Sequence, residues 1–226
     1  MAGQTKIKCA ERSWVARPPA ALSQAPENRR GPEKSTVTRT KPAEQRRADL
    51  LTAGRTLFLA KGIAATPLDD ITRLAGVSKG LFYLYFASKQ DLVLALQEQF
   101  SGEVAARMAA AATALAEAGQ ADWGARLDAC VAAGFGSYRE LHDLHEVLFH
   151  HAHPVRPDPA AATLVIGDLL AAGVAAGALD VSDPEATAVL CYASMHAFDL
   201  RGHGGPDDTR LIRAAQQLVR RAAGLP

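Results

Sequence analysis

The sequence is poor in cysteine and in aromatic residues, and each shortage argues against a class of protein. The three cysteines, Cys9, Cys130 and Cys191, lie far apart, so their spacing indicates neither a disulfide framework nor a Cys-x-x-Cys metal site. Aromatic residues make up only 6% of the chain, whereas alanine is abundant. Small side chains in this proportion favour closely packed helices over a β-sandwich. We therefore expect an all-α fold in a reducing compartment.

Long hydrophobic runs are also missing. No apolar segment approaches the roughly 20 residues that a membrane-spanning helix requires, and no signal-peptide hydrophobic region follows the basic start. A hydrophobic fraction of 48% over 226 residues is nevertheless enough to form a packed core. The sequence thus predicts a cytoplasmic protein that does not interact with a membrane.

The net charge of +1 conceals a strong asymmetry along the chain. Residues 1–43 contain nine basic and three acidic side chains, residues 44–91 contain seven and five, and residues 92–226 contain nine and sixteen. A basic front and an acidic back are expected when one end of a protein binds a polyanion. A solvated basic tail without a partner would give the same asymmetry.

Residues 1–41 show no helical or strand periodicity and contain several prolines. Such a segment buries too little apolar area to offset chain entropy, so we expect a disordered basic tail. One interpretation is an arm that follows phosphates or enters a minor groove, continued by Arg46 and Arg47. The other is an extension without a function.

Residues 66–91 have the pattern of two short helices joined by a tight turn. Thr66 is expected to cap the first helix, with Pro67 at its first helical position. Gly76 can supply the left-handed residue that ends this helix, and Ser78 can cap the second. Helix, glycine-containing turn and helix together form the helix-turn-helix pattern.

The apolar positions of this stretch indicate which sides face inward. The positions expected to be buried are Leu68, Ile71, Leu74, Ala75, Val77, Phe82 and Phe86. The exposed side of the second helix would carry Lys79, Gly80, Tyr83 and part of Tyr85. A preceding helix over residues 42–61 would complete a three-helix unit. Ser88 opens a further helix that would act as a lever into the second region, unless it is interrupted at Ser101-Gly102.

These residues resemble the DNA-binding signature of a known family. The stretch from about residue 43 to residue 96 is similar to the tetracycline-repressor (TetR) family of bacterial regulators. The resemblance is carried by Asp70-Ile71-Thr72-Arg73-Leu74-Ala75-Gly76-Val77-Ser78-Lys79-Gly80-Leu81-Phe82-Tyr83-Leu84-Tyr85-Phe86-Ala87-Ser88-Lys89. It implies a helix-turn-helix DNA-binding domain over residues 42–90 and a larger helical effector-binding and dimerisation domain over residues 91–226. The chain departs from many members at Leu81, where they have threonine.

The expected DNA contacts follow from the chemistry of each side chain. Lys79, Gly80 and Leu81 would lie nearest the base edges at the start of the recognition helix. Tyr83 and Tyr85 would contact phosphate or sugar. The complete expected set is Arg46, Arg47, Thr66, Pro67, Leu68, Ser78, Lys79, Gly80, Leu81, Tyr83, Tyr85 and Lys89. In this set Lys89 would clamp a phosphate, and residues 66–68 would form a phosphate site at a helix N-terminus.

Beyond Gly119 we expect helices over about 122–138, 139–152, 160–176, 184–200 and a last one ending near 222. The last two carry apolar stripes wide enough for more than one neighbour. Two copies of the chain could pair them in a four-helix bundle, as the TetR resemblance implies. A homodimer would then place two recognition helices on a palindromic operator. Alternatively, both stripes close the core of a single chain.

Histidines are the other prominent feature of the second region. Four residues are weak candidates for metal ligands because their spacing places them on roughly one face of a helix: His142, His145, Glu146 and His150. Alternatively, histidines line an apolar effector pocket, whose candidate residues are Trp123, Phe135, Tyr138, His142, His145, Phe149, Tyr192, His196 and Phe198. A third reading places the histidines on a helix surface and in a loop. We expect no resident metal.

Two function classes therefore remain. The first is a ligand-responsive transcriptional repressor that binds double-stranded operator DNA as a homodimer and is released by a small-molecule effector. The second is a metal- or small-molecule-binding helical protein, a metal sensor or an enzyme, built around the histidine cluster. No nucleophile with a paired base, glycine-rich phosphate loop or complete metal triad is present at diagnostic spacing. We therefore expect neither enzymatic activity nor a cofactor.

Overall fold

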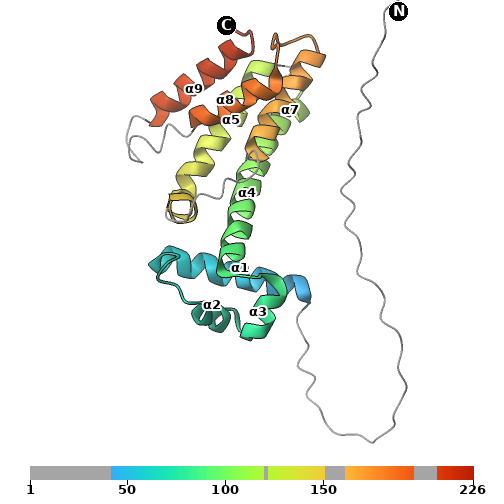
Figure 1. Ribbon diagram of the computed structural model, residues 1–226. Helices are drawn as coiled ribbons and strands as arrows, with labels where there is room; N and C mark the ends of the chain where they lie inside the picture. Colours follow the sequence, from blue (N-terminus) through green and yellow to red (C-terminus); the bar gives the residue numbers. More distant parts are fainter. Residues whose placement is uncertain (1–41, 120–121, 151–160, 196–207) are drawn as a thin grey trace, which may run out of the picture. The chain divides into compact units, whose positions relative to one another are not determined.

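The computed structural model describes residues 42–119, 122–150, 161–195 and 208–226, and within these ranges the regular elements are all helices (Figure 1). The predicted all-α fold class is confirmed. Lys41–Pro226 forms one compact unit. The predicted basic tail over residues 1–41 lies outside the described residues. No helix in the described ranges combines the length and the apolar character that crossing a lipid bilayer requires.

The first helices form the predicted three-helix unit. They are α1 (Ala43–Lys61), α2 (Leu68–Ala75) and α3 (Lys79–Tyr85). Each contributes an aromatic or branched side chain that is 0% exposed, namely Phe58, Ile71 and Phe82. These three side chains belong to the same buried apolar cluster as α4 and the rest of the fold, so the unit is packed onto the start of α4. Leu74 departs from the prediction, since it is 54% exposed.

The turn between α2 and α3 has the predicted geometry. Gly76 adopts φ 67° and ψ 34°, the left-handed region that costs glycine no steric penalty. Its N–H donates to the carbonyl of Arg73 at 3.2 Å, and the N–H of Val77 donates to the carbonyl of Thr72 at 3.0 Å. These bonds satisfy the last carbonyls of α2 and direct the chain into α3.

Helix α4 (Lys89–Glu117) runs without interruption past Ser101 and Gly102. Its 29 residues give a length of about 43 Å at 1.5 Å per residue. Ser88 caps it as predicted, because its Oγ accepts a hydrogen bond from the N–H of Asp91 at 3.1 Å. The helix packs against α1 and also against α5 and α7. A single rigid rod therefore joins the three-helix unit to the rest of the fold. The predicted domain boundary at residues 90–91 falls within its first turn and stays a prediction.

The remaining described elements are α5 (Trp123–Glu140), α6 (His142–His145), the π-helix η1 (Glu146–His150), α7 (Ala161–Ala175), α8 (Pro184–Met195) and α9 (Asp208–Ala222). Helix α5 packs on α4, α7 packs on α8, and α9 packs on α5 and α8. The predicted single helix over residues 139–152 is wrong. Leu141 leaves the helical conformation with φ −104° and ψ 16°, and the chain then continues as a short α-helix and a π-turn.

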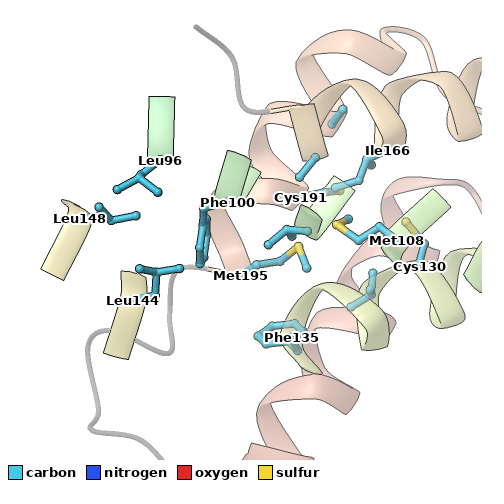
Figure 2. Packing of buried hydrophobic residues seen from close by; sticks show 14 of the residues in the cluster. Leu96, Phe100, Met108, Cys130, Phe135, Leu144, Leu148, Ile166, Cys191 and Met195 are labelled. Atoms are coloured by element: carbon cyan, nitrogen blue, oxygen red, sulfur yellow. The ribbon is translucent and has the colours of Figure 1, made fainter. Parts of the chain in front are cut away.

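The large core lies between α4, α5, α7 and α8, with side chains from α6 and η1 added at one end (Figure 2). Its largest fully buried side chains include Met108, Leu127, Phe135, Leu170 and Met195. This core fixes the C-terminal half of α4, while the three-helix unit fixes the other end.

Candidate nucleic-acid interface

Helix α3 is held by a cap at its start and an aromatic anchor on its inner face. Ser78 has the extended conformation of an N-cap, and its Oγ accepts a hydrogen bond from the N–H of Leu81 at 3.2 Å, as predicted. Phe82 is fully buried and contacts the ring of Phe86, with 5.6 Å between ring centroids. With this side fixed inward, the opposite side of α3 faces solvent.

That outer side carries four of the twelve residues expected to contact DNA. Ser78, Lys79 and Gly80 are exposed, and Tyr83 is 53% exposed. Leu81 and Tyr85 are half-buried, and Tyr85 packs against the core, as expected for part of its ring.

Leu84, which the sequence prediction missed, is the most exposed large apolar residue of this unit at 78%. It lies one helical turn beyond Gly80, so the helical period of α3 was the signal that could have found it.

An ion pair joins α3 to α2. Lys79 Nζ lies 2.7 Å from Asp69 Oδ1, and the two side chains are 56% and 65% exposed. The hydrogen bond that Lys79 donates to the carboxylate of Asp69 is the main cause that raises the pKa of Lys79. Helix α3 therefore presents a fully charged ammonium with a carboxylate beside it. Asp69 is a second residue of this surface that the sequence prediction missed.

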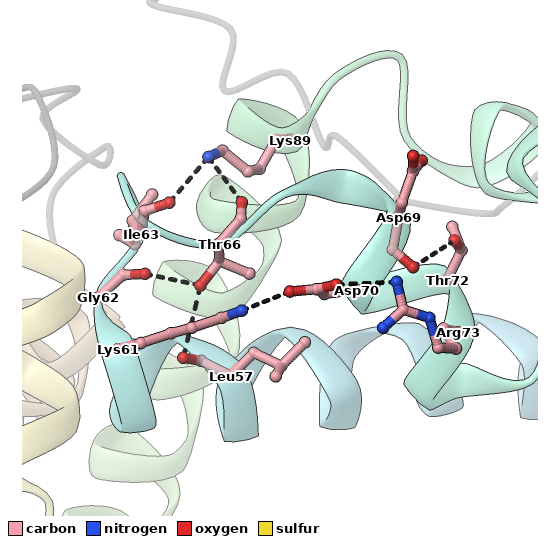
Figure 3. Close-up of polar contacts among 10 residues, drawn as sticks. All are labelled: Leu57, Lys61, Gly62, Ile63, Thr66, Asp69, Asp70, Thr72, Arg73 and Lys89. Atoms are coloured by element: carbon pink, nitrogen blue, oxygen red, sulfur yellow. Dashed lines mark hydrogen bonds and ion pairs between the residues drawn. The ribbon is translucent and has the colours of Figure 1, made fainter.

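The expectation that Thr66 caps α2 is wrong. Thr66 is 0% exposed, and its hydroxyl donates to the carbonyl of Gly62 at 2.7 Å (Figure 3). Pro67 occupies the N-cap position instead, without a side-chain cap, and α2 begins at Leu68. The threonine hydroxyl therefore bonds the loop that precedes α2 and does not cap the helix.

Lys89 lies at the first position of α4 and points back toward the same loop. Its Nζ donates to the carbonyls of Ile63 at 2.8 Å and Thr66 at 3.0 Å (Figure 3). The ammonium therefore ties the loop between α1 and α2 to the start of α4. The phosphate contact expected of Lys89 stays a prediction, and it competes with these two bonds.

Asp70 joins α2 to α1. One carboxylate oxygen pairs with Lys61, and the other lies 3.0 Å from a guanidinium nitrogen of Arg73 (Figure 3). The hydrogen bond from Lys61 is the largest cause that lowers the pKa of Asp70. Of the two N-terminal arginines, Arg46 is half-buried, while the guanidinium of Arg47 lies 5.4 Å from the ring centroid of Phe86. Arg47 is thus held next to the end of α3.

The structure brings several predicted effector-pocket residues together. His145 is buried and stacks on Phe149 with 4.9 Å between ring centroids, and both rings contact Phe100 at 5.5 Å. Tyr138 meets the edge of His145, and its hydroxyl lies 2.7 Å from that of Tyr192. Phe100 was missed because it comes from α4, far away in sequence.

The other pocket candidates are placed differently or not described. The guanidinium carbon of Arg126 lies 4.1 Å from the ring centroid of Trp123. Phe135 is 1% exposed and lies in the core. His196 and Phe198 lie outside the described residues. An open groove of about 650 Å³ between α7 and α8, which was not predicted, is lined by Thr163, Leu164, Gly167, Asp168, Ala171, Ser182, Asp183, Pro184, Glu185, Ala188 and Val189.

The histidine cluster is only partly assembled. His145 is buried among aromatic rings, whereas His142 and Glu146 are half-buried, and the side chain of His150 is not described. Among the residues that the structure describes, no group of three or more His, Cys, Asp or Glu is arranged to hold a metal ion.

Comparison with known proteins covers mainly this N-terminal unit. Residues 50–96 match the sequence model of bacterial regulatory proteins of the tetR family. The chain is 44% identical to the HTH-type transcriptional regulator TtgR of Pseudomonas putida over 61 residues, which is 26% of this chain and 29% of TtgR. It is 30% identical to the transcriptional activator FasR of Mycolicibacterium smegmatis over 120 residues, or 53% and 52% of the two chains. The matches thus span about half or less of these curated relatives.

Solved structures extend the likeness to most of the fold. A TetR-family regulator from Mesorhizobium loti covers 81% of this chain and 98% of its own, with a TM-score of 0.63 and 16% identity. FadR of Bacillus subtilis, solved in complex with stearoyl-CoA, covers 77% and 98%, with a TM-score of 0.59 and 16% identity. At these identities the likeness concerns the fold. Over residues 50–96 the chain is therefore similar to the TetR family of bacterial regulators, and its described helices have the fold of solved TetR-family structures.

Proposed function

We propose that this chain is a ligand-responsive transcriptional regulator, a homodimeric repressor that binds a palindromic operator and is released by a small-molecule effector. The proposal assigns it no catalytic role. The observation that carries it is the solvent-facing side of α3, with Lys79 and Tyr83 exposed on a helix that is capped by Ser78 and anchored by Phe82. A short rigid helix of this kind fits the major groove and offers a cation near base edges and phosphates.

Exposed apolar side chains on the last two helices support the homodimer. Val189 and Leu190 of α8 are 49% and 71% exposed, and Leu218 of α9 is 51% exposed. Burying such side chains against a second copy would remove apolar area from water. One recognition helix contacts few bases, so a twofold pair about one turn of B-DNA apart (roughly 34 Å) would supply the specificity.

Two features support control by an effector. Helix α4 is continuous between the three-helix unit and the large core, so a change in core packing would move the DNA-binding unit. Gln97 of α4 is buried and donates from Nε2 to the carbonyl of Leu148 in η1 at 2.7 Å. This bond links α4 to the segment that carries Phe149. An effector that binds one arrangement of these helices more tightly would shift the population of DNA-binding chains. FadR of Bacillus subtilis, which has the same fold, was solved in complex with stearoyl-CoA, and this supports control by a small-molecule effector.

A gel shift with DNA from upstream of the chain's own gene tests the proposal. We expect retardation at nanomolar protein that weakens steeply with added salt, because phosphate contacts release counterions. Footprinting should then show two protected half-sites related by a twofold axis. Binding to this DNA that is no tighter than binding to a scrambled duplex of equal composition would overturn the proposal.

A further inference from the structure

The sulfur-containing side chains of the described residues meet in one place. Met108 comes from α4, Cys130 from α5, and Cys191 and Met195 from α8. Their exposed fractions are 0%, 1%, 3% and 2%. Figure 2 shows the four side chains grouped in the same part of the core. Residues widely separated in sequence thus bring two thiols and two thioethers together.

Gly134 of α5 shows how closely the thioethers approach. A β-carbon at this position would lie 2.0 Å from the Cε of Met195, 3.2 Å from the Sδ of Met108 and 3.5 Å from the Sδ of Met195. The methyl of Met195 therefore fills the space beside Gly134, and both thioether sulfurs lie next to it. Cys130 lies one helical turn before Gly134, and Cys191 lies one turn before Met195, so each thiol is on the same helical face as this space.

In this apolar core an ionised thiol would be more stable when it is paired with a singly charged cation than when it is alone. Cys130 and Cys191 are 1% and 3% exposed, so neither thiol reaches water. A thiolate in this apolar core is costly without a partner. One thiolate with one monovalent cation would form a neutral unit, and thioether sulfurs donate without losing a proton.

We propose that Met108, Cys130, Cys191 and Met195 form a binding site for a monovalent soft metal ion, Cu(I). Thiolate and thioether sulfur are the ligands that select Cu(I), whereas zinc sites use thiolate, imidazole and carboxylate. On binding, one thiol loses its proton to the solvent as the S–Cu bond forms, and no oxidation state changes. The cysteine spacing alone gave no metal site, because the fold rather than the sequence brings these residues together. The inference is independent of DNA binding.

The test uses the full chain with Cys9→Ser, so that only the core thiols remain. The reduced protein is titrated anaerobically with Cu(I) in competition with the chromogenic chelator bicinchoninate. We expect about one Cu(I) per chain to be withdrawn from the chelator, with X-ray absorption showing sulfur ligands only. A protein that leaves all the copper with the chelator would overturn the proposal.

Variants separate ligation from packing. In the same background, Cys130→Ala/Cys191→Ala should lose the bound copper. Met108→Leu/Met195→Leu, which roughly conserves core volume, decides the matter if the cysteine variant does not fold. Leu127→Val is a control that disturbs the same core without removing sulfur, and it should retain copper. Copper retention by the folded methionine variant equal to that of the parent would contradict the four-residue site.

Discussion

The ammonium of Lys79 lies 2.7 Å from the carboxylate of Asp69, so the recognition helix carries its main cation already paired with an acid from the helix before it. Both side chains are exposed, and water and salt screen the pair. We therefore expect the pair to affect DNA binding rather than stability. A phosphate that approaches Lys79 must compete with Asp69.

Replacing Asp69 by asparagine should strengthen DNA binding. The change removes the competing charge and a repulsion of the phosphates, so we expect a several-fold gain in affinity at low salt. The dependence of log K on log salt should also steepen by about 0.9, the value for one further phosphate contact. Titrations at several salt concentrations measure both. Asp168→Asn, the same change at an exposed site on α7, should have no effect, and equal behaviour of the two variants would contradict this role of Asp69.

Removing the cap of α3 should loosen the recognition helix. Ser78→Ala deletes the acceptor for the N–H of Leu81, which typically costs about 1 kcal/mol of stability. Urea unfolding measures this loss, and operator affinity should fall with it. Ser101→Ala, in the middle of α4, provides the matched control, and an unchanged unfolding midpoint in the Ser78 variant would argue against the cap.

Lys89 offers a choice between two roles. If its two bonds to the carbonyls of Ile63 and Thr66 hold the loop, Lys89→Met should lower the free energy of unfolding by about 2 kcal/mol, because it leaves two carbonyls without their donor. If Lys89 instead acts mainly on phosphate, stability should be unchanged while DNA affinity falls. Chemical unfolding in the absence of DNA distinguishes the two, and we expect the loss of stability.

The pair between Asp70 and Lys61 should make stability depend on pH in the acid range. The folded-state pKa of Asp70 is lowered below its ordinary value of 3.8, mainly by Lys61, so the unfolded chain binds this proton more tightly. The contribution is thus complete above about pH 4 and is lost as pH falls further. The difference in melting temperature between the parent and Asp70→Asn should be constant near neutral pH and shrink below about pH 4. A difference in melting temperature that persists unchanged to pH 3 would contradict this contribution of the pair between Asp70 and Lys61.

The parts of the site that the sequence predicted correctly depend on neighbours in the chain. The cap at Ser78 and the left-handed turn at Gly76 involve partners within five residues, and local patterns record them. Thr66 looked like a cap by the same rule, but its hydroxyl bonds the loop that precedes it. The bond from Lys89 to the carbonyl of Ile63 could not be predicted from a local pattern, because the two residues are 26 positions apart. Side chains whose partners come from another helix are decided by packing, which no local pattern contains.

The large helical region shows the same limit. Helical periods located α5, α7 and α8, but the break at Leu141 and the π-turn after it were not predicted. These breaks place His145 against Phe100 of α4. The sequence therefore indicated which residues lie in this core, but it did not indicate which of them are in contact.

The most direct test of the account is operator binding by Lys79→Ala and Tyr83→Ala. Both side chains are exposed on α3, so both variants should keep the helical circular dichroism spectrum and the oligomeric state of the parent. Arg139→Ala, which removes one exposed positive charge from the end of α5, serves as the control and should bind normally. We expect both α3 variants to lose retardation of the operator in a gel shift at physiological salt. Parental affinity in both would show that the outer side of α3 does not contact DNA.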